Sequence, residues 1–109
     1  MKHLDFIKKS VLRKSFPHRD DSSHKGNNGR TMIIGGSKEY YGAPLLSALG
    51  TIYSGCDLVY LFVPSYNFDV TRSLYPDFIV RQFEGEYLKP EHVESIIKFA
   101  AQCDVLLIG

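Results

Sequence analysis

The stretch from residue 35 to residue 44 combines small residues with the start of a helix, an arrangement suited to backbone-mediated ligand binding. Its small residues are Gly35, Gly36, Ser37, Gly42 and Ala43. Glycine lets the main chain approach a ligand where a Cβ atom would block it. Pro44 favours the first turn of a helix, and the free N–H groups at a helix N-terminus suit an anion or a polar carbonyl. The stretch is therefore a candidate binding loop.

The glycine spacing matches neither of two common phosphate-binding motifs. The pattern GxGxxG is absent, because the next glycine after Gly36 is Gly42. The Walker pattern also fails, since no Gly-Lys-Ser or Gly-Lys-Thr follows. Taken alone, such glycines are more often tight-turn residues than ligand cradles, so the motif leaves both interpretations open.

Several polar residues near this stretch have two interpretations each. Lys25 could contact a phosphate of a nucleotide or dinucleotide, or it could point to solvent while Gly26 turns the chain. His24 could act in acid–base chemistry, because its ordinary pKa lies near about 6.5, or it could pack in the loop. Ser37 could bind a ligand oxygen or hydrogen-bond its own backbone.

The hydrophobic pattern predicts alternating strands and helices, which is typical of an α/β protein. Four segments are predicted to be strands: residues 31–34, 58–63, 78–83 and 105–108. Helices are predicted over residues 4–14, from Pro44 to Ile52 and from Pro90 to Ala100. The first strand–helix–strand unit should join parallel strands through a right-handed crossover.

Composition places the chain in an ordinary globular class. With 109 residues, 44% hydrophobic and 23% charged, it has room for one small domain. It lacks an apolar run of the roughly 20 residues that cross a bilayer, and its N-terminus lacks the apolar segment of a secretory signal. Cys56 and Cys103 show no metal-ligand spacing and are expected to be small buried thiols. We therefore expect a cytoplasmic protein with no metal site and no membrane partner.

Charge is distributed unevenly along the chain. Residues up to Arg30 contain eight Lys or Arg against three Asp, whereas the remainder contains five against nine acidic residues. A basic arm could attract nucleic acid or an anionic lipid. The positive charge is diluted, however, so we interpret residues 1–23 as a helix and loop arm with a solvated basic face and expect no nucleic-acid partner.

The predicted sheet lacks sufficient cover. Three strands without polar alternation should be covered on both faces, yet only two covering helices are evident. Leaving roughly 500 Å² of apolar sheet in water would forfeit about 10 kcal/mol, the whole stability of a small domain. Either a partner chain covers the gap, or these residues begin a longer domain, and we favour the second explanation.

Five short segments in order resemble the N-terminal part of the ADP- or ATP-dependent NAD(P)H-hydrate dehydratases. The segments are His24-Lys25-Gly26, Gly29-Arg30, Ile34-Gly35-Gly36-Ser37, Tyr41-Gly42-Ala43-Pro44 and Ser54-Gly55-Cys56-Asp57-Leu58-Val59. The resemblance covers roughly residues 10 to 109. It implies a carbohydrate-kinase-like domain with a ribokinase-type fold, an α/β/α sandwich around a mostly parallel sheet, of which residues 1–109 are the N-terminal part.

The resemblance also implies a function for the complete domain. Family members repair hydrated NADH or NADPH by eliminating water, coupled to hydrolysis of ADP or ATP, with Mg²⁺ expected beside the nucleotide. The alanine that contacts the hydrated substrate maps onto Ala43, beside Gly42, and Gly109 aligns with the first glycine of a second substrate loop. Lys25, Gly26 and Ser37 are candidate phosphate or loop contacts. Family members often form tetramers, so a homo-oligomer is expected.

The catalytic end of the family pattern has no counterpart in these residues. The family's Gly-x-Gly-Asp motif, with its acid–base aspartate, is absent, so no catalytic residue is assigned. Asp57 and Asp104 directly precede predicted strands and should lie across the sheet from the site. Two alternatives remain: a small-molecule kinase of the same fold, acting on a pyrimidine, thiazole or sugar, and a non-catalytic binding or assembly module.

Overall fold

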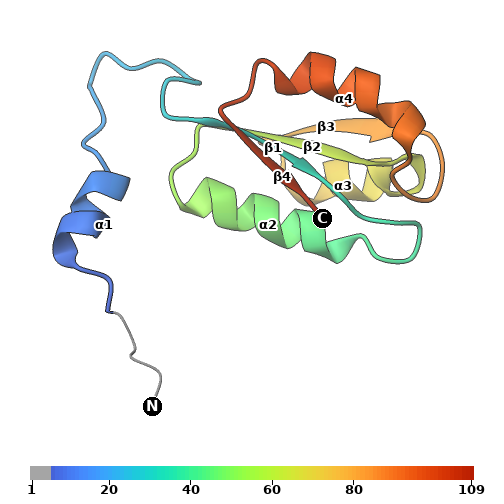
Figure 1. Cartoon of the computed structure of the whole chain (residues 1–109), viewed down its shortest axis with the longest axis horizontal. Helices are drawn as coiled ribbons and strands as arrows, with labels where there is room; N and C mark the ends of the chain where they lie inside the picture. The colour runs from blue at the N-terminus through green and yellow to red at the C-terminus, as the bar shows by residue number, and fades with distance from the viewer. Residues whose placement is uncertain (1–5) are drawn as a thin grey trace.

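A four-stranded sheet forms the centre of the chain in the computed structural model, which describes residues 6–109 (Figure 1). Its strands are β1 (Arg30–Ile34), β2 (Leu58–Pro64), β3 (Phe78–Phe83) and β4 (Val105–Ile108). They pair in the order β3-β2-β1-β4, and all three pairings are parallel. The predicted strands and their parallel direction are confirmed, with one extra residue at the start of β1 and one at the end of β2.

Alternate residues of the central strands point into two separate hydrophobic layers. On one side, Ile33 packs with Leu45 and Ala48 of the following helix. On the other side, Met32 and Ile34 pack in a cluster closed by later segments of the chain. Because β1 and β2 contribute to both layers, their nearly continuous apolar runs are explained.

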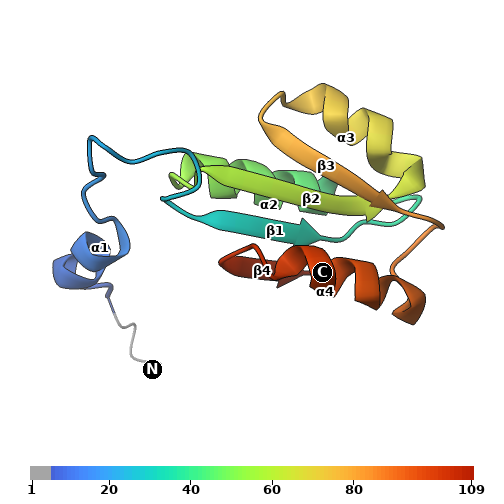
Figure 2. The same ribbon diagram turned by 90° about the horizontal axis from the view of Figure 1, so that it is seen from above.

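Helices cover both faces of the sheet (Figures 1 and 2). Helix α2 (Gly42–Tyr53) and helix α3 (Phe68–Leu74) lie on one face, and helix α4 (Val93–Ala100) lies on the other. Short 3-10 turns precede two of them, Ser65–Asn67 before α3 and Pro90–His92 before α4. The predicted second helix is confirmed but begins two residues before Pro44, which occupies its first turn, where a missing N–H costs nothing.

Helix α3 was not predicted from the sequence. It is only seven residues long, and the residue that it buries completely is polar: Thr71 is 0% exposed, and its hydroxyl has no hydrogen-bond partner among residues 6–109. Its apolar residues Val70 and Leu74 are instead partly exposed. The helix therefore lacks the apolar stripe by which amphipathic helices are recognised in a sequence.

Strand β4 remains open even with this third covering helix. All four of its residues are between 43% and 59% exposed. It pairs with β1 on one side only, at the end of the sheet. Within residues 6–109, the outer edge of β4 is therefore open.

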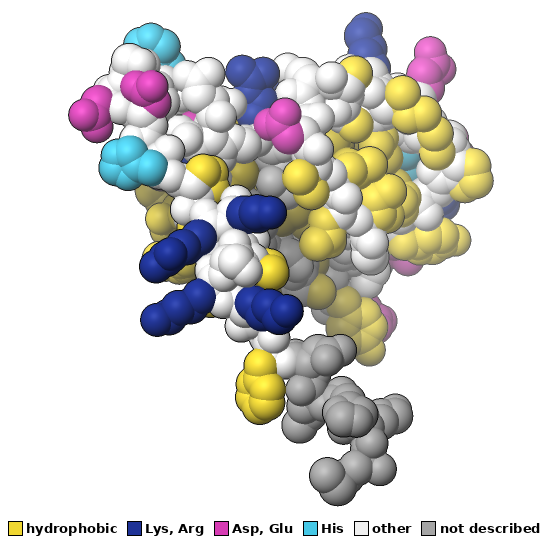
Figure 3. Space-filling model, turned by 60° about the vertical axis from the view of Figure 1, so that its left-hand side comes forward, with side chains coloured by type: hydrophobic (Ala, Val, Ile, Leu, Met, Phe, Trp, Pro, Cys, Tyr) yellow, Lys and Arg dark blue, Asp and Glu magenta, His cyan; other side chains and the backbone are white. Residues whose placement is uncertain are grey.

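The N-terminal arm stands away from the sheet (Figures 1 and 2). Its helix, α1 (Lys9–Ser15), has no buried residue. The helix was predicted over residues 4–14; residues 4 and 5 lie outside the described part of the chain, and Lys8 is extended rather than helical. Lys and Arg side chains gather on this arm (Figure 3), including Arg13 and Lys14 in the last helical turn.

Candidate functional site

The carboxyl ends of β1 and β4 meet through two glycines. The Gly35 N–H donates to the Phe62 carbonyl at 3.2 Å, and the Gly109 N–H donates to the Ile34 carbonyl at 3.1 Å. A Cβ atom on Gly35 would lie 2.6 Å from the Gly109 carbonyl oxygen. The predicted site residues Gly35 and Gly109 are thus in direct contact, and Gly35 has no room for a side chain.

Gly36 continues this corner in a backbone conformation that favours glycine. Its φ of +90° lies in the left-handed region. A Cβ atom there would come within 3.3 Å of the Tyr40 carbonyl oxygen and 3.4 Å of the Asn67 amide nitrogen. Two of the three glycines of the predicted binding loop, Gly35 and Gly36, are therefore required by packing, Gly35 against Gly109 and Gly36 within the loop and against Asn67.

Ser37 bonds with its own loop. Its backbone N–H donates to the Tyr40 carbonyl at 2.8 Å, and its hydroxyl accepts a hydrogen bond from the Tyr40 N–H at 3.1 Å. Its carbonyl accepts a third bond, at 2.8 Å, from the side-chain amide of Asn67. Ser37 thus hydrogen-bonds within its own turn, and a contact between Ser37 and a ligand oxygen stays a prediction.

Gly42 and Ala43 open helix α2 and are both exposed. No side chain caps this helix N-terminus, and a Cβ atom on Gly42 would meet no atom within 4 Å. The helix is 12 residues long, so its dipole favours a negative or carbonyl group at this end. In parallel α/β sheets, ligands sit at this carboxyl edge of the strands. The loop therefore presents free backbone donors beside a small side chain.

A small hollow adjoins the same loop. It has a volume of about 230 Å³ and is lined by Ser37, Lys38, Glu39, Glu86 and Tyr87. The Lys38 ammonium lies 3.0 Å from the Glu86 carboxylate, and this hydrogen bond raises the pKa of Lys38 above its usual value. The lysine at this edge is thus already paired with a carboxylate.

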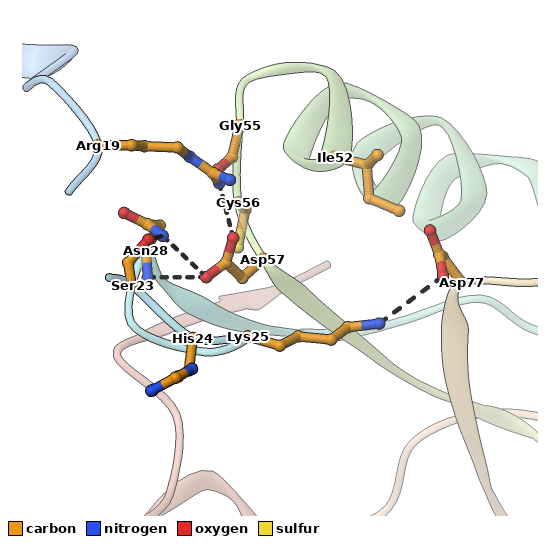
Figure 4. Close-up of a pocket in the computed structure, with 10 residues that line it drawn as sticks. All are labelled: Arg19, Ser23, His24, Lys25, Asn28, Ile52, Gly55, Cys56, Asp57 and Asp77. Carbon is orange, nitrogen blue, oxygen red and sulfur yellow. Dashed lines mark hydrogen bonds and ion pairs between the residues drawn. The ribbon is translucent and has the colours of Figure 1, made fainter. Parts of the chain in front are cut away.

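A larger pocket, of about 490 Å³, lies at the opposite, amino edge of the sheet (Figure 4). At its centre, Asp57 accepts hydrogen bonds from the N–H groups of Gly26 and Asn28, at 3.0 and 2.9 Å. Arg19 reaches it from the N-terminal arm at 2.6 Å. These bonds, the Asn28 N–H first among them, lower the pKa of Asp57 to about 2. Asp57 therefore fixes the loop before β1.

The structure does not bring Lys25 and Gly26 to the edge that carries Ala43. The Lys25 side chain spans the amino-edge pocket towards Asp77, with 3.8 Å between the ammonium and the carboxylate (Figure 4). Gly26 makes a loop contact, with Asp57. A phosphate bound beside Ala43 is therefore out of reach of Lys25 within one chain.

The aspartates that precede strands lie where the sequence placed them. Asp104 precedes β4, and its carboxylate accepts a hydrogen bond at 2.8 Å from the N–H of Arg30, the first residue of β1. Like Asp57, Asp104 lies at the edge of the sheet opposite the glycine corner, which is formed by Gly35, Gly36 and Gly109. Both aspartates hold strand starts together.

Asn67 is the residue of this corner that sequence reasoning missed. It is 3% exposed and follows the carboxyl end of β2 in the 3-10 turn. The only available signal was its position, a polar residue three positions after an apolar strand that ends at the same edge as β1.

Residues 6–109 offer no metal centre and no membrane-crossing helix. No group of three or more His, Cys, Asp or Glu side chains in this part of the chain is arranged to hold a metal ion. Cys56 and Cys103 are free thiols that are partly rather than fully buried. None of the helices in the same residues is long and apolar enough to span a bilayer.

The fold and the glycine corner define a ribokinase-like α/β protein. A crystal structure of a ribokinase-like superfamily protein from Enterococcus faecalis V583 superposes with a TM-score of 0.77 at 28% sequence identity. The match covers 100% of this chain and 38% of that one. The ribokinase-like fold class predicted from the sequence is confirmed.

The family follows from the sequence comparison. Residues 31–109 match the family model described as NAD(P)H-hydrate dehydratase, and the chain belongs to this family. The bifunctional NAD(P)H-hydrate repair enzyme Nnr of Methanothermobacter thermautotrophicus is 43% identical over 93 residues, which are 85% of this chain and 18% of that protein. The ADP-dependent (S)-NAD(P)H-hydrate dehydratase of Cenarchaeum symbiosum is 46% identical over 69 residues, which are 63% of this chain and 24% of that one. The chain thus spans about a fifth to a quarter of the length of these relatives.

Proposed function

We propose that the polypeptide carrying this chain is an ADP-dependent NAD(P)H-hydrate dehydratase, a lyase, and that this chain supplies part of its substrate site. The observation that carries the proposal is the exposed, uncapped start of α2 at Ala43, beside the corner formed by Gly35, Gly36 and Gly109. Family membership supports the reaction, and the similarity to ADP-dependent relatives supports the use of ADP.

The chemistry of this corner is binding rather than proton transfer. A small side chain at Ala43 leaves room for the hydrated ring, and the α2 N-terminus offers donors to its carboxamide oxygen. Elimination of water needs an acid–base group held within hydrogen-bond reach of the departing hydroxyl. We assign no such group to the described residues and propose that an aspartate from the rest of the family domain supplies it.

The nucleotide and its metal are proposed to be held outside these residues. ADP is favoured over ATP because relatives are named ADP-dependent. The described part of the chain has no cluster of metal-ligating side chains.

We further propose that the protein forms a homo-oligomer. The outer side of α2 carries two large apolar side chains, Leu46 and Tyr53, which are 72% and 79% exposed. Burial of such residues between copies would remove apolar surface from water.

The test is recovery of dihydronicotinamide absorbance from hydrated NADH by the longest chain that contains this sequence. Parallel reactions contain ADP, ATP or neither. We expect recovery with ADP and none without nucleotide. Recovery independent of nucleotide, or no recovery with either, would contradict the assignment. Consumption of ATP without recovered absorbance would instead favour a kinase of the same fold.

A further inference from the structure

We propose that Asn67 is a positioning residue for the substrate site, because its side-chain amide holds the loop that presents Ala43. The inference rests on the function proposed above and extends it to a residue from a different segment of the chain. Asn67 is not part of α2, and we do not place it in contact with the substrate.

Asn67 joins two loops at the carboxyl edge of the sheet. It lies in the turn after β2, and its amide nitrogen donates to the Ser37 carbonyl, in the loop after β1, at 2.8 Å. The residue is 3% exposed. A buried amide is costly unless it is hydrogen-bonded, so this bond favours one arrangement of the two loops.

The same amide also fills the space beside Gly36. Its nitrogen lies 3.4 Å from the position that a Cβ atom on Gly36 would take. Ser37 is in turn tied to Tyr40 by two hydrogen bonds, at 2.8 and 3.1 Å. Ala43 follows three residues after Tyr40. The segment from Ser37 to Ala43 is short and is held by its own hydrogen bonds. A change in the position of Asn67 should therefore also move the start of α2.

The contact requires a hydrogen-bond donor at position 67. An introduced carboxyl group donates only when it is protonated, so the contact can be tested by changing the pH. The Ser37 carbonyl only accepts hydrogen bonds, so an ionised carboxylate in place of the amide would face it with a second acceptor. Burial and this unfavourable contact raise the pKa of a carboxyl group. Once protonated, the introduced carboxyl group would regain a donor. The Asn67→Asp variant should therefore be impaired at high pH and recover as the pH falls.

The experiment compares Asn67→Ala, Asn67→Asp and a matched control in the longest chain that contains this sequence. The control is Ser73→Ala, on α3, which removes an exposed hydrogen bond from the Ser73 hydroxyl to the Val70 carbonyl, 2.8 Å long. The readouts are KM for hydrated NADH and KM for ADP, at about pH 8 and about pH 5.5, a range in which a buried carboxyl group titrates. The wild-type profile controls for titration of the surrounding groups: Lys38, Tyr40, Tyr66, Asp69 and Glu86.

We expect Asn67→Ala to raise KM for the hydrate about tenfold, the effect of losing roughly one hydrogen bond, with KM for ADP changed less than about twofold. Asn67→Asp should show the same defect at the higher pH and approach wild type at the lower one. Ser73→Ala should leave both constants unchanged. An equal rise in both KM values, an effect of Ser73→Ala as large as that of Asn67→Ala, or a pH-independent Asn67→Asp defect would each overturn the proposal.

Failure of the proposed function can be distinguished from failure of this inference. If the wild-type protein does not restore NADH, the positioning role of Asn67 is tested by the rate of hydrogen exchange of the Ser37 amide. This amide donates a hydrogen bond to the Tyr40 carbonyl. Faster exchange of this amide in Asn67→Ala than in Ser73→Ala supports the positioning role. Equal exchange overturns it.

Discussion

Gly35 and Gly109 lie so close that a methyl group on the first would collide with the carbonyl oxygen of the second, at 2.6 Å. The contact joins the carboxyl ends of β1 and β4, which are 74 residues apart in the sequence. The glycine that begins the predicted binding loop is thus also the point at which the two strands approach.

Gly35→Ala should destabilise the protein, because the added Cβ would force β4 away from β1. Overpacking of this kind costs about 1–3 kcal/mol in the free energy of unfolding, which denaturant titration of the longest chain can measure. The matched control is Gly50→Ala, inside α2, where a Cβ meets no atom within 4 Å. Alanine there should increase stability by about 0.5–1 kcal/mol, because glycine is a poor helix former. If both variants change stability alike, the close approach has no energetic consequence.

Ala43→Leu should weaken binding of hydrated NADH without unfolding the protein. Ala43 is exposed at the start of α2, so a larger side chain has room in the free protein but occupies the proposed place of the ring. We expect KM for the hydrate to rise at least about tenfold, corresponding to roughly 1.4 kcal/mol. Ser54→Ala, an exposed residue at the far end of the same helix, is the control and should leave KM unchanged. Unchanged KM in Ala43→Leu would remove Ala43 from the site.

The buried strands could be predicted because they consist of continuous apolar residues, such as Met32-Ile33-Ile34. Helix α3 was not predictable in the same way, since the residue it buries completely is Thr71. The expectation of insufficient cover was thus only partly met: α3 adds a helix, but β4 is still open.

The site was predictable where its residues are consecutive and not where they are distant. The loop from Gly35 to Ala43 could be recognised from local spacing. Asn67 could not, because its contact with Ser37 joins segments 30 residues apart. Lys25 was grouped with this loop through a family pattern, yet it precedes β1 in the chain, and a residue before a parallel strand lies at the amino edge.

Lys25→Met should therefore leave KM for both hydrated NADH and ADP unchanged. Lys25 is 65% exposed and faces Asp77 across the amino-edge pocket. An exposed pair of this length contributes little to stability, so the unfolding free energy should change by less than about 1 kcal/mol. A clear rise in either KM would show that Lys25 reaches a ligand, for example in a neighbouring copy of the protein.

Protection of the loop before β1 should depend on pH through Asp57. Its pKa in the folded protein, about 2, lies below the ordinary value of 3.8. Its contribution is therefore fully present above about pH 4 and is lost as the pH falls towards 2. Amide hydrogen exchange of Gly26 and Asn28, which donate to this carboxylate, should lose protection across that interval.

Two comparisons isolate this effect from general acid unfolding. The Gly35 amide, bonded to the Phe62 carbonyl at the other edge, should keep its protection while the loop before β1 loses it. In Asp57→Asn the exchange of Gly26 and Asn28 should no longer change specifically in this interval. Simultaneous loss at both edges would show that Asp57 titration does not open the loop separately.

The open side of β4 affects how this segment can be handled in the laboratory. Val105–Ile108 presents four consecutive apolar residues and a row of backbone groups, and no strand of residues 6–109 lies on that side. Such an edge is a template on which other extended chains can add, so residues 1–109 expressed alone should self-associate or precipitate. Adding a strand that can pair with the open side of β4, either in the same polypeptide or as a peptide, should restore a dispersed protein.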